Sequence, residues 1–191
     1  NDTSLTSAPD NSLRPDFIVD LNNQLHIVWH DRRLGNTQIF YKKINPYLDD
    51  MNGDSAGTGI FVVDDMHISV NSKNELDSKD EHPSIAIDRD GNVHVVWERD
   101  GDDSVGYAKI ANNGSILIPD MRITSKFGSL FRSSASVATD SRNNVHVAWN
   151  DRSRTCDYET YYTMLNGTNG SILINSTLIS LLEINFPSNL P

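Results

Sequence analysis

The stretch NNVHVAWNDR, residues 143–152, decides the fold, because two closely similar stretches occur earlier in the same chain. QLHIVWHDR spans 24–32, and NVHVVWERD spans 92–100. Each copy has an aspartate nine residues before its tryptophan, and the pairs are Asp20 and Trp29, Asp88 and Trp97, and Asp140 and Trp149. This constant spacing indicates that the chain is built from a repeated structural module.

Two further blocks follow each tryptophan in the same order. The first block reads QIFYKK (38–43), SVGYAK (104–109) and ETYYTM (159–164), and it places in register Tyr41, Tyr107 and Tyr162. The second block reads GIFVVDDMHIS (59–69), GSILIPDMRIT (114–124) and GSILINSTLIS (170–180). The first module also carries an insert, INPYLDDMNGDSAGT (44–58), and repeated modules tolerate such an insertion in one turn.

Each module offers four extended segments. These segments are rich in Val, Ile, Phe, Tyr and Trp, which favour strands. The first two segments of each module are joined by DLNNQ, DRDGN and DSRNN, in which Asp, Asn and Gly tolerate positive φ and favour tight turns. Each module is therefore predicted to be an antiparallel, up-and-down sheet of four strands.

A four-stranded sheet repeated in tandem is typical of a β-propeller, in which each blade packs between its neighbours. In the second segment, Leu25, Ile27 and Trp29 point one way while His26 and Val28 point the other, so both faces are mostly apolar or semi-polar. The sequence thus predicts an all-β fold, a β-propeller of four-stranded antiparallel blades with three blades present. An open β-sandwich or a solenoid of sheets is the alternative.

The repeat also predicts where the modules begin and end. We expect an end strand of a preceding blade plus a linker at 1–13, blade 1 with its insert at 14–77, blade 2 at 78–130, and blade 3 with the start of a following module at 131–191. The segment TSLT, residues 3–6, resembles the end of the last block of each module. Because propellers close with about four to eight blades, further blades of a longer chain or other copies of this chain are the expected partners.

Composition excludes some partners and favours a location. The chain has 16 basic and 26 acidic residues and a net charge of −10, which repels phosphate backbones, so nucleic acid is not expected as a partner. No apolar run approaches the roughly 18 residues of a membrane span. Glycosylation triplets begin at Asn1, Asn113, Asn166, Asn169 and Asn175, and they predict a glycoprotein located outside the cell or at its surface.

The pattern Asp-x-x-Gly-Asn-Val-His-Val-Val-Trp, followed by Asp-Arg and a Tyr-rich strand, resembles the sialidase-like β-propeller repeats of secreted bacterial and archaeal proteins, which are related to the Asp box. The resemblance runs from Arg14 to Ser180. For a sialidase it implies three arginines, an aspartate acid/base and a tyrosine nucleophile. Only Arg14, beside Pro15, stands in a place similar to the first arginine motif, and DRDGNVHVVW lacks the serine and threonine of the full Asp box.

We therefore expect a non-catalytic, extracellular propeller segment that serves in binding, adhesion or surface assembly. Carbohydrate or a cell-surface protein is the expected ligand. The alternative is that the chain forms part of a sialidase-type glycoside hydrolase.

The repeated side chains could carry chemistry or structure. His26, His94 and His146 could ring a metal, but we interpret each as a semi-buried residue that bonds a neighbouring blade. The tryptophans could stack on sugars, but their size suits a wedge between blades. Asp31 and Asp151 precede Arg32 and Arg152, a placement that suits fixing the turn and pairing across blades, and Cys156 is predicted to be a free thiol.

No cofactor is certain from the sequence, and calcium is the candidate. Oxygen-bearing side chains alternate along two loops, and the two sets are Glu98, Asp100 and Asp102, and Asp50, Asn52 and Asp54. The second set lacks the glycine after Asp54 and has Phe61 where a calcium loop has its last glutamate. A solvated acidic loop is the competing interpretation.

Overall fold

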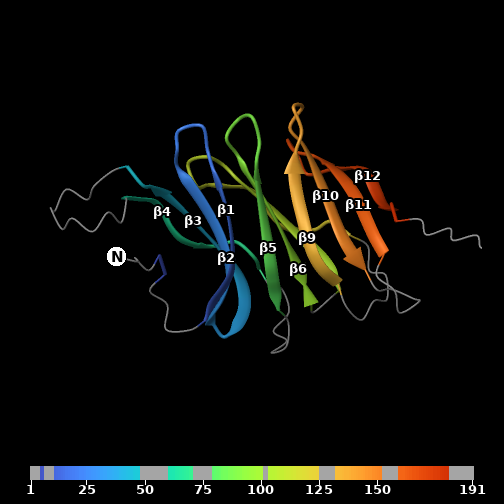
Figure 1. Cartoon of the computed structure of the whole chain (residues 1–191), viewed down its shortest axis with the longest axis horizontal. Helices are drawn as coiled ribbons and strands as arrows, with labels where there is room; N and C mark the ends of the chain where they lie inside the picture. Colours follow the sequence, from blue (N-terminus) through green and yellow to red (C-terminus); the bar gives the residue numbers. More distant parts are fainter. Residues whose placement is uncertain are drawn as a thin grey trace, which may run out of the picture.

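The computed structural model describes residues 5–6, 11–47, 60–70, 79–100, 103–124, 132–151 and 159–180. These residues form three four-stranded antiparallel sheets, each made of four consecutive strands (Figure 1). The predicted all-β propeller architecture with four-stranded blades is confirmed. No helix among the described residues is long and apolar enough to cross a membrane.

The strands follow the repeat. Blade 1 contains β1 (Ser12–Val19), β2 (Leu25–Leu34), β3 (Asn36–Asn45) and β4 (Ile60–His67). Blade 2 contains β5 (Asp80–Ile87), β6 (Val93–Arg99), β7 (Ser104–Ile110) and β8 (Ile116–Arg122). Blade 3 contains β9 (Arg132–Thr139), β10 (Asn144–Asp151), β11 (Glu159–Asn166) and β12 (Ile172–Leu178). Strand β1 begins two residues before the expected boundary at 14, because Ser12 and Leu13 pair with β2.

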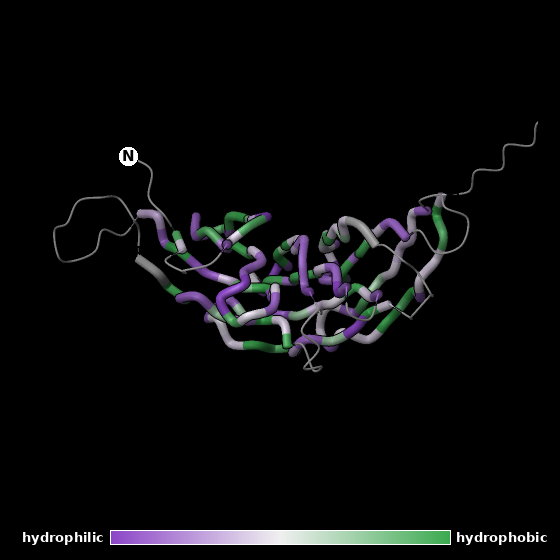
Figure 2. The backbone as a smooth tube through the Cα atoms, turned by 90° about the horizontal axis from the view of Figure 1, so that it is seen from below, coloured by the Kyte–Doolittle hydropathy of each residue, from purple (hydrophilic) through white to green (hydrophobic). Residues whose placement is uncertain are grey.

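The blades stand side by side in chain order. The first strand of each blade, which we call the inner strand, contacts the inner strand of the next blade, so that β1 meets β5 and β5 meets β9. Viewed from below, the three sheets follow an arc (Figure 2). The ends of the inner strands therefore gather residues from successive blades.

The repeated aspartate caps the turn between the first two strands. In blade 1 the Asp20 carboxylate accepts the backbone N–H groups of Asn22 and Gln24, both at 2.8 Å, and Asn23 takes a φ of 58°. Blades 2 and 3 repeat the pattern from Asp88 and Asp140. Such a turn needs a short acceptor side chain and a residue that tolerates positive φ, which explains why the spacing is constant.

The same aspartate binds the repeated histidine. In blade 2, His94 Nε2 lies 3.1 Å from Asp88 Oδ2, and His94 Nδ1 lies 2.9 Å from the Tyr107 hydroxyl. Blade 1 repeats this unit with His26, and blade 3 repeats it with His146. The prediction that each histidine bonds a neighbouring blade is wrong, because both ring nitrogens meet groups of their own blade.

A lysine, rather than the histidine, crosses between blades. Lys109 lies 3.3 Å from Asp88 Oδ2 and donates a 2.6 Å hydrogen bond to the Gly167 carbonyl of blade 3. Lys43 makes the matching 2.9 Å bond to the Asn112 carbonyl of blade 2. In blade 3 the corresponding residue is Met164, two residues after the repeated tyrosine.

The tryptophans lie where successive blades meet. Trp97 of blade 2 shares an apolar cluster with Val28, Ile39, Tyr41 and Ile68 of blade 1. Trp149 of blade 3 packs in the same way with blade 2, whose contributions include Val96, Tyr107 and Ile123. Trp29, Trp97 and Trp149 are 3%, 0% and 2% exposed, so no sugar can stack on these indoles in this structure.

Replacing Lys109 with methionine tests the crossing bond. Lys109→Met removes the bond to Gly167 and leaves the buried Asp88 carboxylate with one cation fewer, so we expect the free energy of unfolding to fall by about 2–4 kcal/mol. Urea denaturation measures this change. Lys79→Met, at an exposed position, is the matched control, and equal stability of the two variants would contradict the assignment.

The buried histidines predict a loss of stability in mild acid. Burial lowers the pKa of His94 to about 4 from an ordinary value of 6.5, so the unfolded chain binds a proton that the folded chain excludes. The contribution of His94 is therefore fully present above pH 6.5 and declines as the pH falls towards 4, by up to about 1.4 kcal/mol per pH unit. Melting curves between pH 7 and 5 measure it. His94→Gln should make the melting temperature less dependent on pH. A wild-type melting temperature that stays constant over this range would refute the predicted role of His94.

Candidate functional site

The three inner strands share an unusual backbone position. Arg14, His82 and Ser134 occupy equivalent places in blades 1, 2 and 3, and their φ angles are 54°, 49° and 51°. The register of each inner strand shifts at this place, which marks a bulge. Positive φ is costly for residues other than glycine, and bulges of this kind re-aim side chains next to functional sites. Of these three residues, His82 lines a cleft.

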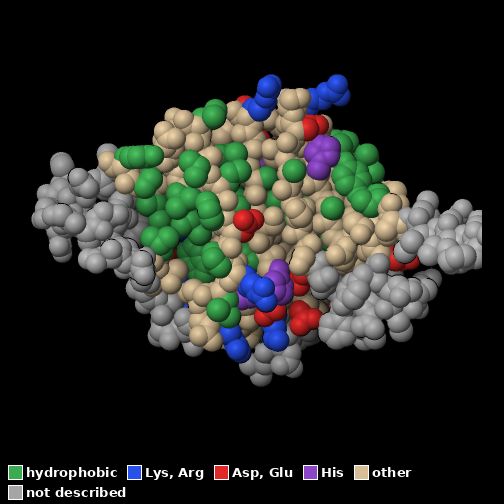
Figure 3. Space-filling model, in the orientation of Figure 1, with side chains coloured by type: hydrophobic (Ala, Val, Ile, Leu, Met, Phe, Trp, Pro, Cys, Tyr) green, Lys and Arg blue, Asp and Glu red, His purple; other side chains and the backbone are tan. Residues whose placement is uncertain are grey.

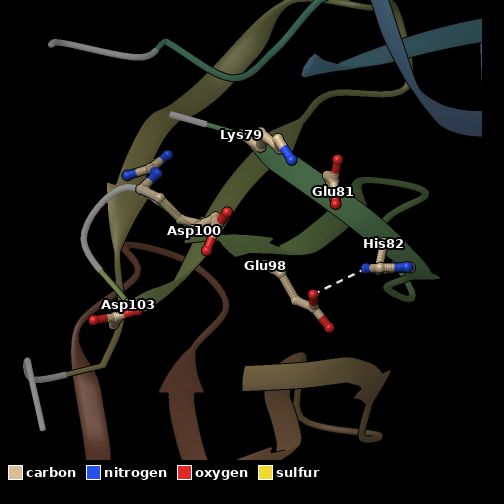
Figure 4. Close-up of a pocket in the computed structure, with 7 residues that line it drawn as sticks. Lys79, Glu81, His82, Glu98, Asp100 and Asp103 are labelled. Atoms are coloured by element: carbon tan, nitrogen blue, oxygen red, sulfur yellow. Dashed lines mark hydrogen bonds and ion pairs between the residues drawn. The ribbon is translucent and has the colours of Figure 1, made fainter. Parts of the chain in front are cut away.

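A cleft lies beside the bulge of blade 2. Its volume is about 260 Å³, and the start of β5 and the β6–β7 loop provide its walls (Figure 4). All the residues that line it carry ionisable side chains, and they are Lys79, Glu81, His82, Glu98, Arg99, Asp100 and Asp103. Such a lining suits a hydrophilic ligand with several hydroxyl groups, because donors and acceptors of both charge signs surround it.

Glu98 joins two blades at the cleft. Its Oε2 atom lies 2.9 Å from His82 Nδ1, and its Oε1 atom accepts the backbone N–H of Ser134 in blade 3. Figure 4 shows the Glu98 side chain pointing towards His82 and away from Asp100. The carboxylate thus fixes both the imidazole ring of blade 2 and the bulge of blade 3. A charged acceptor with two such donors holds a defined orientation.

His30 occupies in blade 1 the position that Glu98 occupies in blade 2, since each directly follows the repeated tryptophan. The His30 ring is 6% exposed, and its centroid lies 6.0 Å from the centroid of His82. Burial lowers the pKa of His30, which leaves the imidazole neutral at neutral pH. Within the described part of the chain, His30 Nδ1 has no hydrogen-bond partner.

Arg99, which lines the cleft, is held by two carboxylates that lie outside the lining. Arg99 donates from Nε to Asp80 at 3.2 Å and from a terminal nitrogen to Asp120, and its guanidinium lies 5.6 Å from the centre of the Trp97 ring. Burial raises the pKa of Asp80, although Arg99 opposes this effect. The guanidinium is therefore committed to holding β5, β6 and β8 together.

Blade 1 also contains an arginine bound to two aspartates, but at other positions of the repeat. Arg33 donates to Asp31 at 2.7 Å and to Asp65 at 2.5 Å. Burial alone would raise the pKa of Asp31, but hydrogen bonds from Arg33, Ser12 and Trp29 outweigh it and hold the pKa well below its ordinary value. The Asp31 carboxylate also accepts the backbone N–H of Arg33 at 2.8 Å. The expected pairing of Asp31 across blades is wrong, because its partner Arg33 lies in the same blade. Arg152 and Cys156 lie outside the described residues.

The calcium prediction is only partly covered by the described residues. Asp50, Asn52, Asp54 and Asp102 lie outside them. Glu98 faces His82, and Asp100 is exposed at the cleft, where its backbone N–H donates to the Lys79 carbonyl. In the described ranges, no group of three or more His, Cys, Asp or Glu side chains is arranged to hold a metal ion.

The glycosylation triplets fall on turns and on an outer strand. Asn113 and Asn169 are exposed at equivalent turns of blades 2 and 3, and each side-chain oxygen accepts the backbone N–H of the serine two residues on. Asn166 lies at the end of β11, Asn175 is exposed in β12, and Asn1 lies outside the described residues. Asn-Gly-Ser is also a favoured turn sequence, so these triplets have a structural reason to recur.

The functional-site residues that the sequence did not reveal are His30, His82 and Ser134. The aligned copies place Arg14, His82 and Ser134 in one column and His30, Glu98 and Asn150 in another. Both columns differ from copy to copy, whereas the structural columns are constant. That variation within an otherwise constant repeat is the signal that would have pointed to the cleft.

Fold and cleft together define a β-propeller segment with a polar site at the ends of its inner strands. Similar solved structures are a Hadza microbial sialidase (TM-score 0.58, 10% identity), an alpha-L-arabinanase from Penicillium chrysogenum complexed with arabinobiose (0.57, 12%) and an endo-arabinase from Bacteroides thetaiotaomicron VPI-5482 (0.53, 12%). At such identities the likeness shows the fold alone.

The chain is shorter than these similar proteins. In the same order, the likeness covers 84%, 93% and 88% of this chain but only 36%, 48% and 61% of the similar protein. The chain therefore spans about half of the length of these proteins. No family model matches the sequence, and no curated protein matches it either.

Calcium remains a prediction with a direct test. If the loop at residues 50–54 holds Ca²⁺, millimolar Ca²⁺ should stabilise the chain by about 1–2 kcal/mol at concentrations some ten times the dissociation constant, and EDTA should reverse the effect. Differential scanning calorimetry of the wild type and of Asp54→Asn measures it. Asp64→Asn, at an exposed carboxylate of β4, is the control, and a melt insensitive to Ca²⁺ would rule the site out.

Proposed function

We propose that this chain is a sialidase-like, carbohydrate-binding segment of an extracellular β-propeller, and that it binds its ligand without turning it over. The observation that carries the proposal is the His82–Glu98 pair, fixed across two blades at the mouth of a polar cleft. An oriented carboxylate and imidazole can accept from and donate to neighbouring sugar hydroxyls. A site built for hydroxyl groups strongly disfavours ligands that lack them.

The arginines support a non-catalytic role. A sialidase-type site needs free guanidinium groups to hold the substrate carboxylate, but Arg33 and Arg99 each bind two aspartates of their own blade. Arg14 is exposed on the bulge of β1, which leaves it as a candidate for this role. A neutral sugar therefore fits the cleft better than an acidic one.

The exposed triplets support the extracellular part of the proposal. Asn113, Asn169 and Asn175 present their side chains at the surface, where a glycosylating enzyme could reach them. Intact mass spectrometry of the protein from its natural source checks this location, since a glycan adds mass in hexose-sized steps.

A second function rests on the carboxylates of the same cleft. Glu81, Glu98, Asp100 and Asp103 share it, and glycoside hydrolysis requires a pair of carboxyl groups beside the glycosidic bond. In this alternative the chain would form part of a glycoside hydrolase, and Glu98 would act as one member of the pair.

Sugar binding can be measured by calorimetric titration against a panel of neutral and acidic oligosaccharides. We expect binding of a neutral sugar, and Glu98→Gln should weaken it about tenfold because a charged acceptor becomes a neutral one. Asp64→Asn, far from the cleft, should leave the affinity unchanged. Binding that survives both Glu98→Gln and His82→Ala would refute the cleft as the site, and turnover of aryl glycosides lost in Glu98→Gln would establish the hydrolase instead.

A further inference from the structure

The face of blade 1 that carries Trp29 is unlike the corresponding faces of blades 2 and 3, because no described blade covers it. Phe17 is 64% exposed there, whereas Ile85, the equivalent residue of blade 2, is 7% exposed beneath blade 1. Leu13 and Val19 are also about half exposed, at 52% and 51%. Figure 3 shows hydrophobic side chains gathered over the blade 1 end of the molecule.

A groove of about 270 Å³ opens on this face. Its lining comes from β1, β2, the short segment at residues 5–6 and Lys42 of β3, and the residues are Leu5, Thr6, Ser12, Leu13, Pro15, Ile27, Trp29 and Lys42. Contiguous apolar surface of this kind marks an interaction site.

Each described blade ends in the same short clip. After the fourth strand of blade 1, the Ile68 N–H donates to the Ile39 carbonyl at 2.9 Å, and the Ser69 hydroxyl accepts the Ile39 N–H at 2.9 Å. Ile123–Thr124 and Ile179–Ser180 repeat the clip in blades 2 and 3. An apolar residue followed by a hydroxyl residue therefore terminates a blade.

The clip also locates the next blade. Ile68 packs in the cluster that contains Trp97, and Ile123 packs in the cluster that contains Trp149. The terminal apolar residue of one blade thus lies against the tryptophan of the blade that follows it.

Leu5 lies against Trp29 of blade 1 as Ile68 and Ile123 lie against the tryptophans of blades 2 and 3. It packs against the cluster of Ile27, Trp29, Phe40 and Ile44, and its carbonyl accepts a 2.8 Å hydrogen bond from Lys42. Leu5 is followed by Thr6, so the pair has the composition of a clip as well as its place.

We infer that the Trp29 face of blade 1 is the docking surface for a further blade of the same polypeptide, one whose fourth strand ends in Leu5–Thr6. The two observed blade interfaces indicate how this further blade packs: it covers Phe17 as blade 1 covers Ile85. Similar propellers of about twice this length are consistent with additional blades.

A second copy of the chain fits the same face less well. To pack as blade 1 packs on blade 2, blade 3 of a second copy would bring Ile179–Ser180 onto Trp29, where Leu5–Thr6 already lies. Docking of a second copy would therefore displace a segment that the face already binds.

The test compares the 191-residue chain with the polypeptide from the natural source. We expect the natural polypeptide to exceed 21.3 kDa by the mass of at least one blade. In that polypeptide Phe17→Asp should lower the melting temperature by about 5–10 °C, since it places a charge in an interface. In the 191-residue chain, where Phe17 is exposed, the change should be within about 2 °C.

Leu117→Asp is the matched control, because Leu117 is 50% exposed on the outer strand of blade 2. It should be tolerated equally in both polypeptides. A natural polypeptide of only 191 residues, or one in which Phe17→Asp is as harmless as Leu117→Asp, would overturn the inference. Sedimentation showing a stable dimer of the 191-residue chain that Phe17→Asp dissociates would also overturn it, because the occupant would then be a second copy.

Discussion

The structure depends on the burial of one tryptophan per blade against the blade before it. A four-stranded sheet of this length has too little interior of its own, so each sheet gains its core from its neighbours. Trp97 and Trp149 show the arrangement in full, with indoles enclosed by strands of two blades. The polar units are built around this contact: Asp88, His94 and Tyr107 stiffen the strands that carry the indole, and Lys109 ties them to the next blade.

The fold could be predicted from the repeat, because every blade needs the same residues at the same spacing to form its turn and to pack against its neighbour. The repeated aspartate and tryptophan, Asp20 and Trp29 in blade 1, keep the same separation in all three copies. The aspartate caps a turn, and the tryptophan packs at an interface between blades. The partner of His26 was not predictable, because strand periodicity gives the direction of a side chain but not which of several nearby polar groups it meets. Glu98 was singled out for its charge, and its actual partners, His82 and the Ser134 backbone, are far away in sequence.

The cleft shows how a repetitive scaffold acquires a particular site. Positive φ at Arg14, His82 and Ser134 is a shared backbone feature, yet no glycine marks it in the sequence. The scaffold therefore repeats the geometry and varies the side chain, so that His30 and Glu98 place different chemical groups at equivalent points. Glu98 also links the geometry of the cleft to blade packing, since it belongs to blade 2 and accepts a backbone N–H of blade 3.

The crossing lysine is replaced by Met164 in blade 3, so the three blades are not equivalent. Blades 1 and 2 are each joined to their successor by an ammonium group that bonds a backbone carbonyl, whereas blade 3 offers a thioether at that point. Met164 cannot donate a hydrogen bond, so blade 3 lacks at this position the ammonium-to-carbonyl link through which Lys43 and Lys109 each tie one blade to the next. The electrostatic tie between blades is therefore a property of individual blades rather than of the repeat.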